Sequence, residues 1–512
     1  MTKIHLYSLA SPLHSEVIPS PADDRFIKEI LACGGVEFVF HNDFSTWGTG
    51  CPSTPPSPGS SAAPASQGRE VLYIRTGGTE GLFLETFFGD AVIPSAPSPV
   101  IPSTPSPVIP SEAKESFTLL TSGESNSLAA SMEILSFLRL RGLSGEILHG
   151  TPASVAARLA APVLPSDPSG RRGSVPSEPQ AHLRPFLAPR LHSSGASSPS
   201  APLSGAEGTA GAGGSLVHPA APSRILEGVR LGVVGRPSDW LISSDVDYAK
   251  ARERFGVEII DIPMEELLDE IRRGGFSIPD AIKLNPLNAP KYGVPFKAGD
   301  FDKALEIYGA LSRIVRKYDL QGLTLRCFDL LGTVGSTGCM ALAILNAEGI
   351  TATCEGDVPA MVTMASASRV AGTSGFQVNL SRIRDEGLLF AHCTVPLNIV
   401  KNYCYDTHFE SGIGVAVHGE FATGPVTLFK VGASMDRFFL APATLVDNPY
   451  ANNLCRTQVI LRPAAPAADA DASSPAAGVA ALADYFLREP LGNHHVILPG
   501  DWVSAIREAC GA

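Results

Sequence analysis

The sequence lacks the features of an exported or membrane-spanning protein. Its N-terminal stretch, MTKIHLYSLASPLHSE, has neither a basic segment nor a long apolar core, so we expect no signal peptide. No stretch approaches the roughly 20 apolar residues that a membrane-spanning helix needs. The nine cysteines are an odd number and include no CxxC pair. This usage predicts reduced thiols in a cytoplasmic protein.

Positive charge is also scarce. The 512 residues carry a formal net charge of −12 at neutral pH, and the chain has no basic tract. An acidic chain of this kind is not expected to have nucleic acid or an anionic membrane as its main partner. With 44% apolar residues, the chain is long enough for two to four domains of about 100–200 residues each.

Residues 323–364 predict a βαβ unit around which the rest of the chain is organised. The unit consists of an apolar run, a loop with three glycines, a helix and a second strand, at 323–331, 332–338, 339–348 and 350–354. The crossover makes the two strands parallel, and ligands gather at the carboxyl ends of such strands. Asp329, Glu355 and Asp357 fall at those ends, so we expect the chemistry there.

Residues 1–163 predict an N-terminal α/β domain with an open, flavodoxin-like parallel sheet, because strands and helices alternate. We expect strands at 3–8, 36–41, 70–75 and 117–121, and helices at 23–33, 76–88 and 128–141. The loops TGGTEG (76–81) and SGESNS (122–127) follow strands and precede helices, so their amides could hold an anionic or hydroxyl-rich ligand. The looseness of these motifs favours the simpler interpretation that the loops only connect elements.

Four Pro/Ser-rich segments interrupt the pattern, at 51–68, 92–111, 164–223 and 463–475. Their composition cannot bury enough apolar surface to offset the entropy of ordering, which predicts disordered insertions. The longest of them, 164–223, would link the first domain to a second α/β domain, flavodoxin-like or Rossmann-like, at 224–370. That domain is expected to contain strands at 228–234 and 257–260 and helices at 246–255, 264–273 and 303–318 before the βαβ unit.

Residues 371–512 predict an antiparallel β domain, either a barrel or a sandwich, because short alternating runs replace the βα rhythm. Strands are expected at 388–394, 414–421, 426–431, 438–445 and 457–461, and a helix at 478–488. The second and third of these strands, joined by ATGP, predict a hairpin.

Carboxylate and imidazole side chains suggest a site for Mn²⁺ or a similar divalent ion. Glu355 follows an apolar strand in the turn CEGD, where a desolvated carboxylate needs a partner cation. His392 lies in an apolar strand, where a lone histidine is more often a hydrogen-bonded core residue. His494 and His495 enter a strand together, and neighbours on a strand point to opposite faces, so only one of them should face a common site.

Other candidates have ordinary structural explanations as well. Asp357 precedes VPAMVTMAS, with Pro359 in the first turn, so it is placed as a helix N-cap. His408 and Glu410 lie in THFESGIG, which a solvated turn also explains. Arg437 could bind a sugar hydroxyl or phosphate, or it could pair with a surface acid.

Three motifs taken together, CEGDVPA, AHCTVPLN and LGNHHVILPGD, resemble the L-fucose and L-arabinose isomerase superfamily, in particular its fucose isomerase-like branch. The resemblance implies two α/β domains followed by a β domain, a homotrimer or homohexamer, and metal-dependent interconversion of aldoses and ketoses, usually with Mn²⁺. It implies Glu355, His392 and His495 as metal ligands, and Glu355 and Asp357 as catalytic candidates. Weaker candidates for binding the sugar are Asp329, Asn379, His408, His494 and Arg437.

One position departs from the family pattern. The family's second metal-binding acid, which is also its acid/base, should lie in GFQVNLSRIRDEG, where this chain has Val378 or Asn379. Isomerisation through an enediol(ate) needs a well-placed base, so either another residue substitutes or the reaction differs. The sequence therefore predicts a metal-dependent sugar isomerase-like protein. The alternative is a non-catalytic or regulatory sugar-binding protein that kept the fold.

Overall fold

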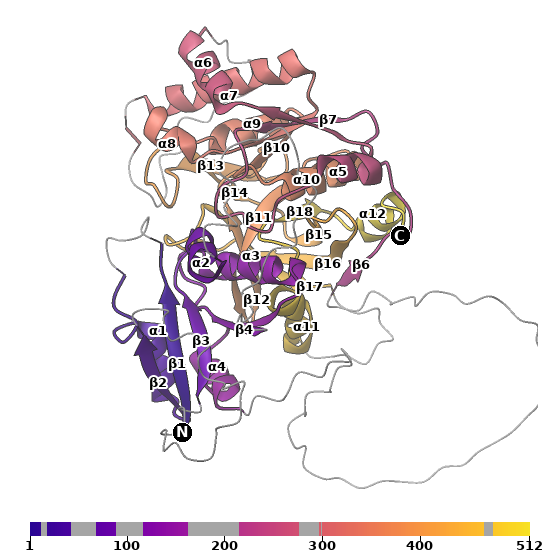
Figure 1. Ribbon diagram of the computed structural model, residues 1–512. Coiled ribbons are helices and arrows are strands. Elements are labelled where there is room, and N and C mark those ends of the chain that lie inside the picture. Colours follow the sequence, from indigo (N-terminus) through magenta and orange to yellow (C-terminus); the bar gives the residue numbers. More distant parts are fainter. Residues whose placement is uncertain are drawn as a thin grey trace, which may run out of the picture. The chain divides into compact units, whose positions relative to one another are not determined.

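The computed structural model describes residues 1–11, 18–41, 68–88, 116–161, 214–275, 296–297, 299–464 and 475–512. These residues form two parallel α/β sheets and an antiparallel β-barrel (Figure 1), which confirms the predicted fold class and decides between barrel and sandwich. Most of each segment predicted to be a disordered insertion lies outside the described residues. No helix in the described ranges is long and apolar enough to cross a membrane.

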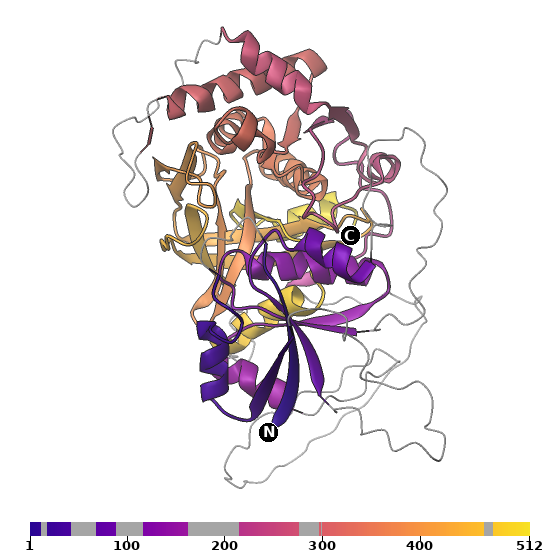
Figure 2. The same ribbon diagram turned by 60° about the vertical axis from the view of Figure 1, so that its left-hand side comes forward.

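The first sheet has the strand order β2-β1-β3-β4-β5, all parallel, which is the order of flavodoxin-like folds. Its strands are β1 (Thr2–Leu9), β2 (Val36–His41), β3 (Arg69–Ile74), β4 (Ser116–Leu120) and β5 (Ser144–Leu148). Helices α1 (Arg25–Ala32) and α4 (Pro152–Ala160) pack on one face, and α2 (Glu80–Phe88) and α3 (Ser127–Leu140) on the other (Figure 2). Successive side chains along each strand point to opposite faces of the pleated sheet, so the apolar ones pack alternately against the two helical layers.

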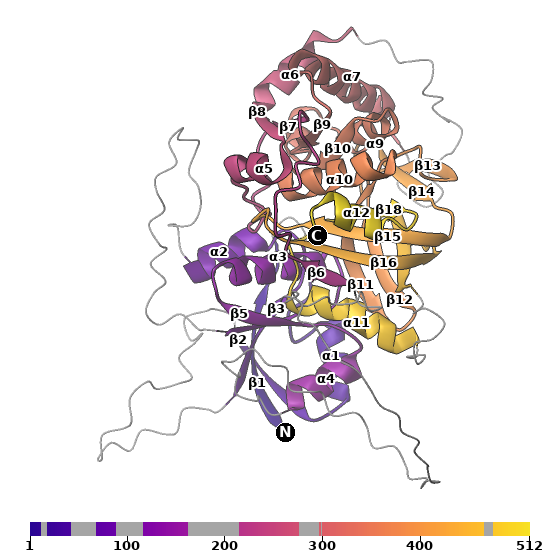
Figure 3. The same ribbon diagram turned by 90° about the vertical axis from the view of Figure 1, so that its right-hand side faces the viewer.

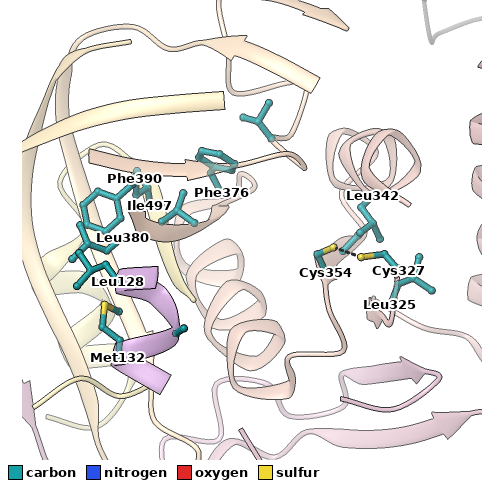
Figure 4. Packing of buried hydrophobic residues seen from close by; sticks show 14 of the residues in the cluster. Leu128, Met132, Leu325, Cys327, Leu342, Cys354, Phe376, Leu380, Phe390 and Ile497 are labelled. Carbon is teal, nitrogen blue, oxygen red and sulfur yellow. Dashed lines mark hydrogen bonds between the residues drawn. The ribbon is translucent and has the colours of Figure 1, made fainter. Parts of the chain in front are cut away.

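The second sheet has the order β10-β9-β7-β8, again all parallel. Its strands are β7 (Arg230–Val234), β8 (Glu258–Ile262), β9 (Gly322–Leu325) and β10 (Thr351–Cys354). Its helices are α5 (Tyr248–Phe255), α6 (Met264–Arg273), α7 (Asp300–Tyr318), α8 (Asp329–Thr333), α9 (Cys339–Ala347) and α10 (Val358–Ala371). The thiol of Cys327, two residues after β9, lies 2.8 Å from the thiol of Cys354, the last residue of β10 (Figure 4).

The strand predicted at 323–331 is wrong in its second half, because β9 ends at Leu325. The next residue, Arg326, turns out of the sheet, and its guanidinium donates to Asp329, Asp239 and the carbonyl oxygen of Pro237. These three bonds fix the turn that leads into α8.

The barrel is closed by six strands in the order β15-β18-β11-β12-β17-β16, with β16 returning to β15 (Figure 3). They are β11 (Phe376–Arg384), β12 (Gly387–His392), β15 (Gly424–Val431), β16 (Phe438–Asp447), β17 (Thr457–Pro463) and β18 (His495–Pro499). Helices α11 (Pro475–Arg488) and α12 (Val503–Ala509) pack against it. Because β16 pairs with β15, the six strands form a closed ring, and free strand edges remain only where a strand extends past its neighbour.

Two predictions for this region are wrong. The expected hairpin does not form: β14 (Ala416–Glu420) pairs with β13 (Asn402–Asp406), and β15 pairs with β16 and β18. The side chain of Asn448 bonds both backbone groups of Phe421 and so holds the chain out of the tight turn. Residues 214–223, predicted as the end of a disordered tract, include strand β6 (Ser215–Val217), which pairs with the start of β16.

Helix α3 connects the first sheet to the barrel. Its sequence SLAASMEILSFLRL is buried from Ser127 to Leu138, and it packs against β11 of the barrel as well as β5 of its own sheet. One continuous apolar cluster, part of which is drawn in Figure 4, contains residues of both sheets and the barrel. The side chains at this junction are therefore held by packing from three directions.

Candidate metal centre

Glu355 occupies a strained turn directly after β10. Its φ is +67°, in the left-handed region that costs a residue with a Cβ roughly 1–2 kcal/mol. Gly356 follows with φ +72°, and a Cβ there would lie 2.3 Å from the carbonyl oxygen of Arg236. The amide of Ser238 donates to the Glu355 carbonyl oxygen at 2.9 Å. The turn is thus fixed from outside, as strained residues at functional sites generally are.

Three buried side chains each bring one possible ligand atom to the same place. Glu355 Oε1 lies 3.4 Å from His494 Nε2 and 3.9 Å from His392 Nε2. All three atoms lie within 4.8 Å of one another. They come from the turn after β10, the end of β12 and the residue before β18. The tertiary fold, rather than any local motif, therefore assembles the cluster.

Each of the three side chains has a second partner that orients it. Trp240 Nε1 donates to Glu355 Oε2 at 2.6 Å, which leaves Oε1 for the cluster. Asp357 Oδ2 accepts from His494 Nδ1 at 2.8 Å, and Thr394 Oγ1 lies 3.0 Å from His392 Nδ1. Outer partners of this kind fix the tautomer and ring orientation of metal-binding histidines.

The charges of the site are strongly coupled. Burial would raise the pKa of Glu355, but the neighbouring His494 and His392 bring it below its usual value. Burial also opposes ionisation of Asp357, yet Lys430 and His494 lower its pKa to about 2. Despite burial, the two carboxylates raise the pKa of His494 to about 10. Burial and the charge of His494 lower the pKa of His392 to about 4.

This donor set fits a divalent metal ion. His494 Nε2 is buried and has no hydrogen-bond partner among the described residues, an arrangement that is costly unless a ligand satisfies the nitrogen. One carboxylate oxygen and two imidazole nitrogens, with further positions left for oxygen ligands, suit Mn²⁺ and similar ions. A divalent cation would take the place of the His494 proton as the positive charge between Glu355 and Asp357.

A cavity that is partly open to solvent adjoins Glu355. Its wall contains polar residues from the barrel and from segments next to both parallel sheets: Glu80, Asn126, Trp240, Glu355, Asn379, Glu410 and Asn493. The loops 76–81 and 122–127, besides connecting strands to helices, supply Gly77, Gly78, Glu80 and Asn126 to this wall. Asn126 Nδ2 donates to Glu410 at 2.8 Å across the cavity wall.

Glu133 of α3 supports the site from behind. One of its carboxylate oxygens accepts the amide of Ser243 at 2.7 Å, and the other accepts the amide of Asn493 at 2.9 Å. Asn493 directly precedes His494, and Ser243 lies three residues after Trp240. A single carboxylate on the first α/β domain therefore anchors two segments that bear site residues.

The structure brings Glu355 and His392 together as predicted, but it reverses the choice between the adjacent histidines. His495, predicted as the third ligand, turns toward α11, where its Nε2 lies 2.9 Å from the Tyr485 hydroxyl. Burial lowers the pKa of His495 to about 3. His494, assigned to the opposite face, points at Glu355 instead. The alternation of side chains along a strand requires His494 and His495 to point to opposite faces, but it does not say which of the two faces the site.

The remaining predicted residues are distributed as follows. Asp357 caps α10 by accepting the Ala360 amide at 2.7 Å and also holds His494, so both of its oxygens are used. Asn379 lines the cavity, and its Oδ1 is buried without a hydrogen-bond partner in the described part of the chain. His408 is buried beside the cavity, with its ring against Phe328.

Two predicted residues lie away from the cavity. Asp329 is half-exposed and accepts from Arg326, because the early end of β9 turns it outward. Arg437 lines a separate small hollow with Arg254.

Sequence reasoning missed several residues that the structure places at the site. Trp240 and Glu133 carry no local signal, because each acts through a contact with a distant segment. Thr394 had a local signal, since it lies two residues after His392, whose ring it contacts. Two others had one. Asn493 adjoins the paired histidines, and Glu80 lies inside the glycine loop TGGTEG.

The fold and the site together describe a protein of two parallel α/β sheets and a barrel, with a buried Glu-His-His group able to hold a metal ion. Comparison with known proteins finds a distant similarity to the sulfoquinovose isomerase of Clostridium sp. (strain MSTE9), a sugar isomerase, with 27% identity over 195 residues. The match covers 35% of this chain and 42% of the relative's length. No protein-family model matches the chain.

Proposed function

We propose that this protein is a metal-dependent sugar isomerase that interconverts an aldose and a ketose through an enediol(ate). The observation that carries the proposal is the convergence of Glu355, His392 and His494 within 4.8 Å beside a polar cavity. The distant similarity to a sugar isomerase supports it. We further propose that the chain belongs to the L-fucose and L-arabinose isomerase superfamily, which its three sequence motifs resemble.

Glu355, His392 and His494 would hold the ion, most suitably Mn²⁺. When bound, such an ion would supply polarisation of the sugar carbonyl. Asp357 keeps the Nδ1 proton of His494 in place, which directs the Nε2 lone pair inward. Trp240 holds the second oxygen of Glu355, so the carboxylate cannot rotate away.

The cavity suits a hydroxyl-rich substrate. Asn126, Asn379 and Asn493 contribute amide groups to its wall, and amides can both donate to and accept from sugar hydroxyls. Among the described residues that line the cavity there is no lysine or arginine. Glu355 itself is only 9% exposed, so its carboxylate is largely shielded from bulk water.

The rival function is sugar binding without chemistry. It is favoured by one observation: the place that matches the family's second acid holds Val378 or Asn379, and the structure puts the amide residue Asn379 at the cavity wall. An amide cannot accept a proton in the neutral pH range, so the two functions differ over whether another residue supplies that acid.

The function can be tested with metal-stripped protein. Manganese should bind with a stoichiometry near one, raise the melting temperature, and support aldose–ketose conversion in a sugar panel. Glu355→Gln should abolish tight binding, and His494→Ala should weaken it at least tenfold, whereas the exposed controls Glu253→Gln and His218→Ala should bind like wild type. Retention of the metal-dependent melting shift by Glu355→Gln would show that the site is wrongly placed.

The resemblance also leads us to propose a cytoplasmic homotrimer or homohexamer, as expected for a closed ring of subunits. Sedimentation at low micromolar concentration checks this proposal. A single species at the 53.6 kDa monomer mass would contradict it.

A further inference from the structure

The proposed isomerisation requires protons to move on oxygen as well as on carbon. Hydrogen leaves C2 and arrives at C1, while a proton arrives at O1 and another leaves O2. Glu355 is one carboxylate beside the cavity, but the place that matches the family's second acid holds Val378 or Asn379, and neither side chain can carry a proton. A second proton-carrying group must therefore come from elsewhere in the cavity wall.

Glu80 is a further carboxyl group in that wall. It is the first residue of α2, in the loop TGGTEG, and it lines the same cavity as Glu355. The residue is 2% exposed. Its Oε2 is buried and has no hydrogen-bond partner among the described residues. A buried carboxyl oxygen without a partner destabilises the fold, so its presence here points to a ligand rather than to stability.

The surroundings of Glu80 favour its protonated form. Burial raises the pKa of Glu80 well above its usual value, its own backbone amide opposes the shift, and Glu133, Glu355 and Glu410 raise the pKa further. A buried carboxyl group of this kind is held protonated and can therefore donate a proton at the cavity wall.

We propose that Glu80 is a catalytic acid–base residue, the second carboxyl group that this chain uses in place of the acid missing at Val378 or Asn379. This inference rests on the proposed isomerase function. In the aldose-to-ketose direction, Glu355 takes the proton from C2, the C–H electron pair forms the C1=C2 double bond, and Glu80 gives its proton to O1. Glu355 then returns the proton to C1 while Glu80 removes one from O2. Both carboxyl groups end as they began, and no other reactant is needed.

The test compares Glu80→Gln with Glu85→Gln, which changes the same residue type at an exposed position of the same helix. Manganese affinity by calorimetry, melting temperature and the rate of conversion of whichever sugar the wild type accepts are measured for each. We expect Glu80→Gln to bind manganese within twofold of wild type, to melt at the same temperature or higher, and to lose at least 100-fold in kcat. Glu85→Gln should match wild type in all three.

The possible failures are distinguishable. If the wild type is active and the kcat of Glu80→Gln lies within about threefold of the wild-type kcat, the role of Glu80 is overturned, but the proposed isomerase function is not. A Glu80→Gln variant that melts lower and loses manganese would show a structural residue and would also overturn it. If manganese-loaded wild type converts no sugar of the panel, the proposed function falls, and the role of Glu80 falls with it.

Discussion

Replacing Asp357 by Asn should damage stability and metal binding through two separable contacts. The Asp357 side chain caps α10 at the Ala360 amide, accepts from His494 Nδ1 and lies 3.9 Å from Lys430 Nζ. Asp357 and Lys430 are both fully buried. Asparagine keeps the size of the side chain and an oxygen for the cap, but it removes the negative charge that both His494 and Lys430 face.

The expected magnitudes follow from these contacts. Leaving a buried charge without its partner costs about 3–5 kcal/mol. Globular proteins unfold with about 2.1 cal/mol/K of entropy per residue, so roughly 400 ordered residues convert each kcal/mol into about 1 °C. Asp357→Asn should therefore melt about 3–6 °C below wild type. Loss of the carboxylate that orients His494 should weaken manganese binding about 10- to 100-fold.

A second substitution separates the two effects. Lys430→Met removes the buried ammonium group, whose Nζ has no hydrogen-bond partner among the described residues. The double variant Asp357→Asn/Lys430→Met should regain most of the lost melting temperature, because no unpaired charge remains. Its manganese affinity should stay low, since His494 still lacks its carboxylate. Melting by fluorimetry and binding by calorimetry give both quantities for the same preparations.

Two outcomes would refute this reasoning. Asp357→Asn melting within 1 °C of wild type would mean that Lys430 is not a buried cation that depends on this carboxylate. Recovery of manganese affinity in the double variant would mean that the affinity loss came from the unpaired lysine rather than from His494.

Two further predictions concern the turn of Glu355 and the junction of the first sheet with the barrel. Gly356→Ala should destabilise severely and abolish manganese binding, because its Cβ would meet the Arg236 carbonyl oxygen, whereas Gly372→Ala, whose Cβ meets open space at φ +65°, should cost only about 1 kcal/mol. If the two variants have similar melting temperatures and similar manganese affinities by calorimetry, this prediction is wrong. His149 is held neutral between the Thr121 carbonyl oxygen and the Ile383 amide, and burial lowers its pKa to about 4. Only the unfolded chain takes up its proton as the pH falls from 6.5 toward 4, so this group should remove about 2 kcal/mol of stability between pH 8 and pH 5. His149→Gln should narrow the difference in melting temperature between those pH values by about 2 °C, and an unchanged difference would argue against a neutral buried ring.

The pattern of apolar runs predicted most of the strands and helices. It failed where a contact with a residue distant in the sequence determines the course of the backbone. Strand β5, SGEIL, was missed because its polar residues hide a strand that only pairing with β4 stabilises. Strand β11 was missed because a bulge between Leu380 and Arg382 breaks its alternation. The false hairpin before β15 reflects the same limit, since Asn448 diverts the chain from a distant position.

The candidate site was predictable to the extent that its residues lie in local patterns. Glu355 follows an apolar strand in a tight turn, and that context survived in the structure. The choice between His494 and His495 depends on the register of β18 against β11, where Val378 pairs with His495, and this is a tertiary fact. Trp240, Glu133 and Glu80 reach the site across long sequence separations, so no local rule could have found them together.

The central claim is best tested by proton exchange at carbon. Wild-type protein loaded with manganese is incubated with a panel of aldoses and ketoses in deuterium oxide, and the carbon-bound hydrogens at C1 and C2 are followed by nuclear magnetic resonance. The account predicts that at least one sugar exchanges one of these hydrogens for deuterium, that a chelator stops the exchange, and that Glu355→Gln does not catalyse it. Tight manganese binding at Glu355, His392 and His494 with no exchange into any sugar would contradict the isomerase function and leave a sugar-binding protein.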